Sequence, residues 1–140
     1  MIKHPNSSER PEINTIFVVD DEENWSYLTK RTLQKSGVGK HIITASNGLE
    51  AINELQARVA NQESMPELIF LDIKMPVMDG FEFLEEISRS AILNFDQTKV
   101  YIYSSSFHPK DRERASHYPI SGFITKPLTN EVLAAIVSSI

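Results

Sequence analysis

Residues 68–72, Leu68-Ile69-Phe70-Leu71-Asp72, form a run of four apolar residues that ends in an acid, and this run decides the fold class. Its side chains do not alternate between apolar and polar, which is typical of a strand that is covered on both faces. Residues 16–19 and 100–103 have the same character. Shorter β-branched or apolar runs at 41–44 and 122–124 complete a set of five predicted strands.

Segments with helical spacing separate these strands. Apolar residues recur every three or four positions in residues 25–33, 49–59, 81–91 and 132–140, and a short helix is expected at about 109–117, with Pro109 in its first turn. Gly37 is suited to close the first helix, and Thr129 is suited to begin the last. Strands that alternate with helices predict right-handed crossovers. The expected fold class is therefore α/β, a doubly wound sheet of five parallel strands with helices on both faces.

Composition limits what such a domain can do. The chain has 140 residues, a net charge of −5 and no cysteine, which excludes disulfides, thiolate nucleophiles and zinc sites built from cysteine. The acidic balance argues against a nucleic-acid surface. No apolar run approaches the roughly 20 residues that span a bilayer, and no secretory signal begins the chain. We expect a polar, flexible arm at 1–14, one domain at 15–140, and a cytoplasmic location.

Polar side chains follow four of the predicted strands. Asp20 and Asp21 follow the first, Asp72 the third, Ser104 the fourth and Lys126 the fifth. Because ligands of open parallel sheets bind beyond the carboxyl ends of the strands, these groups are expected to converge there. Three carboxylates without His or Cys suit Mg²⁺, which would also relieve their mutual repulsion.

The same groups suit phosphoryl chemistry. A carboxylate can act as a nucleophile toward phosphorus. Lys126 could then neutralise phosphoryl oxygens and Ser104 could donate a hydrogen bond to one of them. Two plainer interpretations are also open: Asp20 and Asp21 could only cap a helix, and Lys126 could form a structural salt bridge with Asp72.

Strings at these strand ends match a known family. They are VVDDE at 18–22, LDIKMPVMDG at 71–80, Ser104-Ser105 and TKP at 125–127. Residues 15–140 resemble the receiver domain of two-component response regulators. This resemblance implies the flavodoxin or CheY-like fold, with strand order 2-1-3-4-5.

The resemblance also implies a reaction. Asp72 would accept a phosphoryl group from a sensor histidine kinase or a histidine phosphotransfer protein. Magnesium would be held by Asp20, Asp21, Asp72 and the backbone carbonyl of Lys74. Apart from the resemblance, Trp25 falls close to these acids and could report on metal binding, although it could also be an ordinary core aromatic. The domain would not be an enzyme beyond its own phosphorylation and dephosphorylation.

Further residues would form a switch. Lys126 would pair with the acids and then with the phosphate, and Ser104 would move toward a phosphoryl oxygen. Phe123 would turn inward, although it could also be an ordinary core residue. A cis peptide bond would precede Pro127. The family more often has Thr at the position of Ser104 and Tyr at that of Phe123.

The readout is expected on the short helix near 109–117, the strand at 122–124 and the C-terminal helix. It would contact an unidentified output protein, with no nucleic acid or membrane as partner, from a monomer or weak dimer acting as a stand-alone receiver. The segment at 61–65 is expected to be an extended helix end or a loop. The alternatives are an unphosphorylated receiver-like adaptor and a phosphatase of the haloacid dehalogenase type. The phosphatase would need an acid where Lys74 stands.

Overall fold

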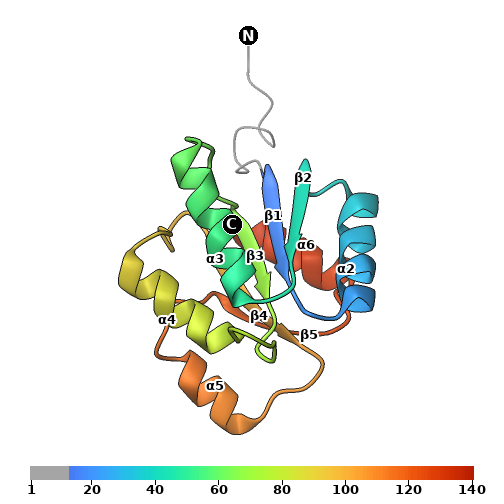
Figure 1. Ribbon diagram of the computed structural model, residues 1–140. Helices are drawn as coiled ribbons and strands as arrows, with labels where there is room; N and C mark the ends of the chain where they lie inside the picture. Colours follow the sequence, from blue (N-terminus) through green and yellow to red (C-terminus); the bar gives the residue numbers. More distant parts are fainter. Residues whose placement is uncertain (1–12) are drawn as a thin grey trace.

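The structure is a computed structural model that describes residues 13–140. In this part of the chain, five strands alternate with five helices (Figure 1). In chain order they are β1 (Thr15–Val19), α2 (Glu23–Ser36), β2 (His41–Ala45), α3 (Gly48–Ala60), β3 (Leu68–Leu71), α4 (Gly80–Ser90), β4 (Lys99–Ser104), α5 (Pro109–Ala115), β5 (Gly122–Thr125) and α6 (Asn130–Ser139).

The sheet confirms the predicted fold class. All four strand pairs are parallel and the strand order is β2-β1-β3-β4-β5. Val19 pairs with Leu71 and Ser104 pairs with Thr125, so strands that are far apart in the sequence end at one edge of the sheet. The residues that follow these strands therefore meet there.

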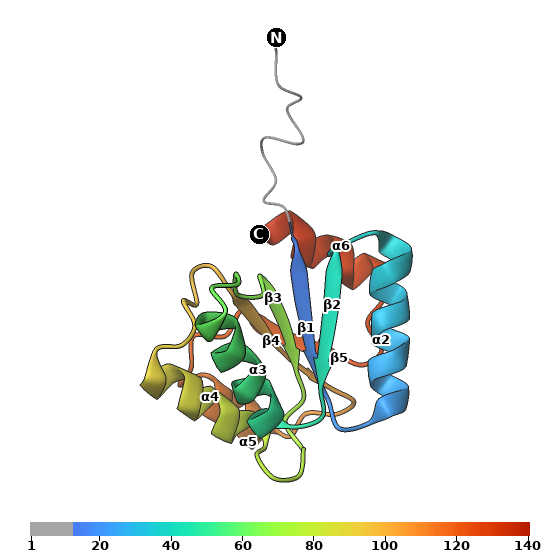
Figure 2. The same ribbon diagram turned by 45° about the horizontal axis from the view of Figure 1, so that its top comes forward.

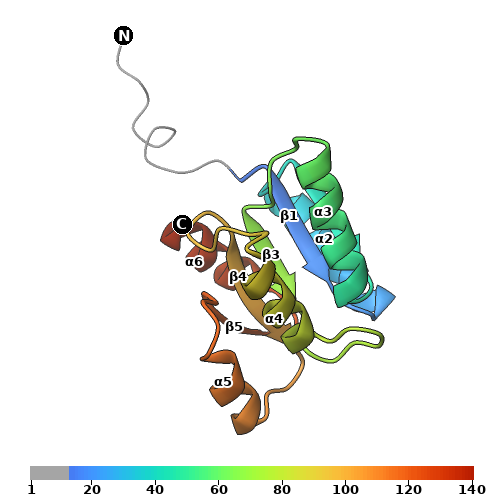
Figure 3. The ribbon, with the colours of Figure 1, turned by 60° about the vertical axis from the view of Figure 1, so that its left-hand side comes forward.

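Helices cover both faces of the sheet. Figures 1 and 2 show α2 and α6 on one side and α3, α4 and α5 on the other, and Figure 3 shows the same layers from another direction. Two buried clusters match this division. Leu33 and Leu133 belong to the cluster under α2 and α6, whereas Leu55 and Leu84 belong to the opposite one. β1 and β3 are buried along their whole length, as their apolar runs predict.

Local signals place the helix ends. Gly37 closes α2 in the left-handed conformation with φ 76°, which glycine adopts without steric cost. Thr129 Oγ1 accepts a hydrogen bond from Val132 N at 3.2 Å and so caps α6. Pro109 is the first residue of α5. These three predictions are confirmed. α3 ends at Ala60, so residues 61–65 are a loop and not a longer helix.

The start of the folded unit differs from the expected boundary. Residues 1–12 of the expected arm lie outside the described residues. Ile13 is buried in the core, and the Asn14 carbonyl accepts from His41 N at 2.8 Å. Residues 13 and 14 therefore pack against the domain, before the expected boundary at Thr15. Among the helices of residues 13–140, none has the length and apolar content to cross a membrane.

Candidate functional site

Three carboxylates meet at the carboxyl edge of the sheet. Asp20 and Asp72 follow the neighbouring strands β1 and β3, and backbone hydrogen bonds extend the ladder to them: Asp72 N donates to Val19 O at 2.9 Å and Asp20 N to Ala45 O at 3.0 Å. One oxygen from each of Asp20, Asp21 and Asp72 lies within 4.8 Å of the others. Asp20 and Asp72 are buried, with 3% and 5% of their surface exposed, whereas Asp21 is exposed.

A buried ammonium group completes the cluster. Lys126 Nζ lies 2.6 Å from Asp20 Oδ2 and 3.6 Å from Asp72 Oδ2. The residue follows β5, and its N–H donates to Ser104 O at 2.8 Å. The peptide bond between Lys126 and Pro127 is cis. One cation thus contacts two of three neighbouring carboxylates, which leaves a net negative cluster of hard oxygen ligands that suits a divalent cation.

Burial controls the ionisation of Asp72. Loss of solvent raises its pKa to about 6, and the nearby Asp20 carboxylate also raises it, while the Lys126 ammonium partly offsets both effects. At neutral pH most of the Asp72 carboxyl groups are still ionised. The carboxylate is therefore available as a nucleophile, but it is held in an environment that favours neutralisation by a cation or a proton.

We expect Asp72→Asn to change how stability depends on pH. In the metal-free wild type, the folded-state pKa of about 6 lies above the unfolded value of 3.8, so the folded protein loses stability as pH rises through this window. The Asn variant lacks this loss. Its free energy of unfolding relative to wild type should therefore gain about 2 kcal/mol between pH 4 and pH 8. Urea unfolding in EDTA at several pH values measures the free energy of unfolding of both proteins. A difference between variant and wild type that does not change with pH would contradict the prediction.

Asp20 also has a local structural role. Its Oδ1 accepts a hydrogen bond from Glu22 N at 3.0 Å, just before α2 begins at Glu23. Oδ2 of the same carboxylate faces Lys126. The N-cap residue of α2 is Glu22, and no side chain caps this helix, so the helix-capping interpretation of Asp20 and Asp21 is wrong. Asp20 instead closes the turn before α2 with one oxygen and faces Lys126 with the other.

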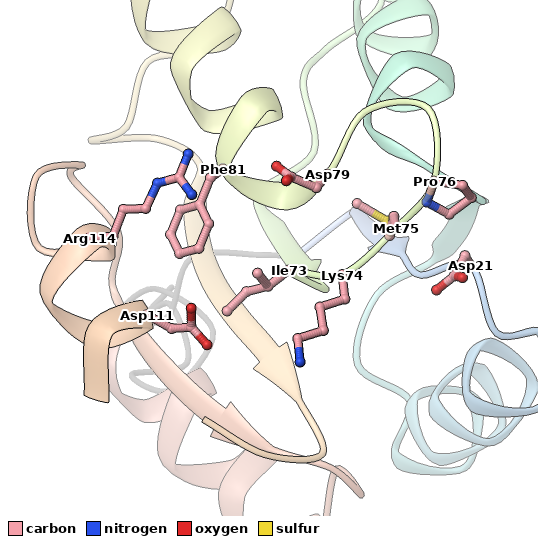
Figure 4. A pocket seen from close by; sticks show the side chains of 9 residues that line it. All are labelled: Asp21, Ile73, Lys74, Met75, Pro76, Asp79, Phe81, Asp111 and Arg114. Atoms are coloured by element: carbon pink, nitrogen blue, oxygen red, sulfur yellow. The ribbon is translucent and has the colours of Figure 1, made fainter. Parts of the chain in front are cut away.

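An open hollow of about 480 Å³ lies beside the acid cluster, between the loop after β3 and α5. Figure 4 shows its lining, which includes Asp21, Lys74 and Asp79 on one side and Asp111 and Arg114 on α5. Lys74 is exposed. Residues next to the buried carboxylates can thus be reached from solvent through a polar opening.

Two of the predicted switch residues do not contact the acids. The Ser104 hydroxyl donates to Ser106 O at 2.8 Å, within its own loop. The Phe123 ring packs edge-on against Phe107, with centroids 5.4 Å apart, and the Arg112 guanidinium lies 4.5 Å from the Phe123 centroid. Phe123 is half-buried. Both side chains therefore have local partners that they would have to leave in any switch.

Comparison with known proteins assigns this site to a family. A family model described as the response regulator receiver domain matches residues 16–138. The chain belongs to this family. Receiver domains are signalling domains of two-component systems, and they bind Mg²⁺ in an acidic pocket.

Individual proteins are similar to this chain in sequence or in fold. The sensor histidine kinase CheAY of Helicobacter pylori is 28% identical over 131 residues, which are 94% of this chain and 15% of that protein. A two-component response regulator from Cytophaga hutchinsonii has a TM-score of 0.83 at 24% identity, with 92% of this chain and 97% of that one covered. The Mn²⁺-bound form of the response regulator Rcp1 has a TM-score of 0.68 at 26% identity, and 90% of each chain is covered.

Aromatic and hydroxyl side chains surround Lys126 in this receiver, and the sequence pattern does not identify all of them as part of the site. The Lys126 ammonium lies 5.3 Å from the Trp25 ring centroid and 5.4 Å from that of Tyr103. The Tyr103 hydroxyl lies 2.7 Å from Thr29 Oγ1. Trp25 is expected near the acids because it is four residues after Asp21. Tyr103 and Thr29 carry no such signal, since one is in an apolar strand and the other in a helical stripe.

Proposed function

We propose that this receiver accepts a phosphoryl group on Asp72 from a sensor histidine kinase or a histidine phosphotransfer protein. The observation that carries the proposal is the buried Lys126 ammonium between Asp20 and Asp72, with Asp21 beside them at the mouth of the site. A purely structural ion pair needs one carboxylate, whereas this cluster has three.

Magnesium would be held by Asp20, Asp21, Asp72 and the Lys74 carbonyl, and when bound it supplies positive charge to the phosphoryl oxygens. The response regulator Rcp1, a similar receiver, has a form that binds the divalent cation Mn²⁺, which supports this choice of ligand class. The donor set fits, because its carboxylate oxygens are hard ligands and carry more negative charge than Lys126 compensates.

The transfer is an in-line displacement at phosphorus. An ionised Asp72 oxygen forms the new O–P bond while the N–P bond of a phosphohistidine breaks, and its electron pair stays on the imidazole nitrogen. Lys126 holds the attacking carboxylate and then pairs with a phosphoryl oxygen. The hollow lined by Lys74 and Asp111 gives the donor access to this site. CheAY, a sensor histidine kinase by name, matches nearly the whole of this chain, which supports a histidine kinase as donor class.

Phosphorylation would then switch a partner-binding surface formed by α5, β5 and α6. The Ser104 hydroxyl would exchange Ser106 O for a phosphoryl oxygen. Phe123 would move toward the space that Ser104 leaves, and in doing so would lose its contacts with Phe107 and Arg112. The phosphate can shift this equilibrium only by contacts that it makes in the active state alone.

The decisive experiment measures the intact mass of the protein after incubation with acetyl phosphate and MgCl₂. We expect one phosphoryl adduct that is absent in Asp72→Asn and in EDTA. Asp96→Asn is the matched control, because Asp96 is an exposed acid in the loop before β4, and it should form the adduct as wild type does. An absent wild-type adduct would favour the adaptor interpretation, and steady hydrolysis of phosphate monoesters would favour a phosphatase.

A further inference from the structure

A buried hydrogen-bond network joins α2 to the loop that carries Lys126. The Tyr103 hydroxyl lies 2.7 Å from Thr29 Oγ1 and accepts a hydrogen bond from Leu128 N at 3.1 Å. Tyr103 and Thr29 are almost completely buried, with 1% and 2% of their surface exposed. Because Leu128 is two residues after Lys126, this hydroxyl fixes the backbone next to the lysine.

The rings of the same region hold the lysine side chain. The Lys126 ammonium lies within 5.4 Å of the ring centroids of both Tyr103 and Trp25, which is inside the range of cation–π attraction. Trp25 and Thr29 are four residues apart on α2 and therefore lie on the same face of this helix. One face of α2 thus contacts both Lys126 and the tyrosine that supports it.

The Tyr103 hydroxyl has a partner both for its oxygen and for its proton, as a buried phenol requires. Its oxygen accepts from Leu128 N, and its proton is available for Thr29 Oγ1. Burial raises the pKa of Tyr103, so this proton stays in place at neutral pH. Val100 and Ile102 on the same strand are apolar and buried. A phenol in such a strand costs free energy unless its hydroxyl is bonded, and here Thr29 and Leu128 supply both partners.

We propose that Tyr103 is a positioning residue for phosphorylation, which holds the Lys126 ammonium against Asp20 and Asp72 through its ring and through the Leu128 amide. This inference rests on the proposed function, because it assumes that Lys126 neutralises charge during transfer. According to this inference, the position of the Lys126 ammonium relative to Asp20 and Asp72 depends on α2, through Thr29, and on β4, through Tyr103.

The test compares two variants with a matched control. Tyr103→Phe keeps the ring and removes the hydroxyl, and Thr29→Val removes the other side-chain partner of this hydroxyl. Tyr101→Phe makes the same chemical change two residues away on β4, where the ring also packs against Phe70. We measure the phosphorylation rate with acetyl phosphate at saturating MgCl₂, the Mg²⁺ dissociation constant by calorimetry, and the fraction folded.

We expect Tyr103→Phe to slow phosphorylation about three- to tenfold, because both buried hydrogen bonds of its hydroxyl are lost, and Thr29→Val, which removes only one of them, to slow it less. The Mg²⁺ dissociation constant should not increase, because the three carboxylates stay in place and a looser ammonium repels the cation less. Tyr101→Phe should match wild type.

Three results would overturn the inference. The first is a rate within twofold of wild type in both variants. The second is a loss of rate that parallels weaker Mg²⁺ binding, which indicates general damage to the acid site. The third is an equal loss in Tyr101→Phe. A wild type that forms no adduct would contradict the proposed function and this inference together, whereas normal rates in the variants of a phosphorylated protein contradict the inference alone.

Discussion

Lys126→Met is expected to slow phosphorylation of Asp72 about 100-fold or more while the protein still binds Mg²⁺. Lys126 is the buried cation that contacts both Asp20 and Asp72. Removing a group that neutralises developing charge in a closed site typically costs two to three orders of magnitude in rate. Mg²⁺ should bind more tightly to the variant, because the ammonium no longer repels it. Phosphorylation time courses with acetyl phosphate measure the rate, and calorimetric titration with MgCl₂ measures the affinity for Mg²⁺.

The same variant should lose stability when no metal is present. Asp20 and Asp72 remain buried without their cation, and breaking a buried pair by removing one partner costs about 3–5 kcal/mol. The loss should shrink as pH falls through about 6 and below, because Asp72 takes up a proton there, and MgCl₂ should restore part of the stability. Lys110→Met is the control, since Lys110 is exposed on α5. A Lys126→Met protein with wild-type rate would remove Lys126 from the proposed mechanism.

Most of the fold follows from local patterns in the sequence. The apolar runs of β1 and β3 predict strands buried on both faces, and the structure buries every residue of both. Gly37 and Thr129 mark helix ends through conformation and capping, which depend on near neighbours only. The acids could be placed together for a related reason. In a parallel sheet, a residue that directly follows a strand must lie at the carboxyl edge, whatever the details of packing.

The contacts that tune the site depend on packing between distant elements. The Thr29–Tyr103 hydrogen bond joins residues 74 positions apart, and nothing in either local pattern indicates it. The direction of the Ser104 hydroxyl is a rotamer choice that its own loop decides through Ser106 O. Likewise, the position of Phe123 under Arg112 follows from how α5 packs beside β5. Sequence patterns predict where a side chain starts, whereas its partners depend on tertiary structure.

Gly80→Ala is expected to damage the site from a position that carries no charge. Gly80 begins α4, and its N–H donates to Ile73 O at 2.8 Å. A Cβ at this position would clash with the Asp72 carbonyl oxygen and would lie 2.9 Å from Ile73 Cα. These are backbone atoms and cannot move aside as a flexible side chain can. The loop that carries Asp72 must therefore shift relative to α4, whose start is fixed by the capping box of Asp79 and Glu82.

We expect this shift to reduce the free energy of unfolding by about 1–3 kcal/mol and to slow phosphorylation about 10- to 100-fold, because transfer requires accurate placement of the attacking carboxylate. Urea unfolding and the acetyl phosphate assay measure both quantities. Gly37→Ala is the control: its Cβ would meet nothing within 4 Å, so only the left-handed backbone is strained, at about 1 kcal/mol, and the rate should not change. A Gly80→Ala protein that is destabilised yet phosphorylated at the wild-type rate would show that Asp72 keeps its position when the loop behind it moves.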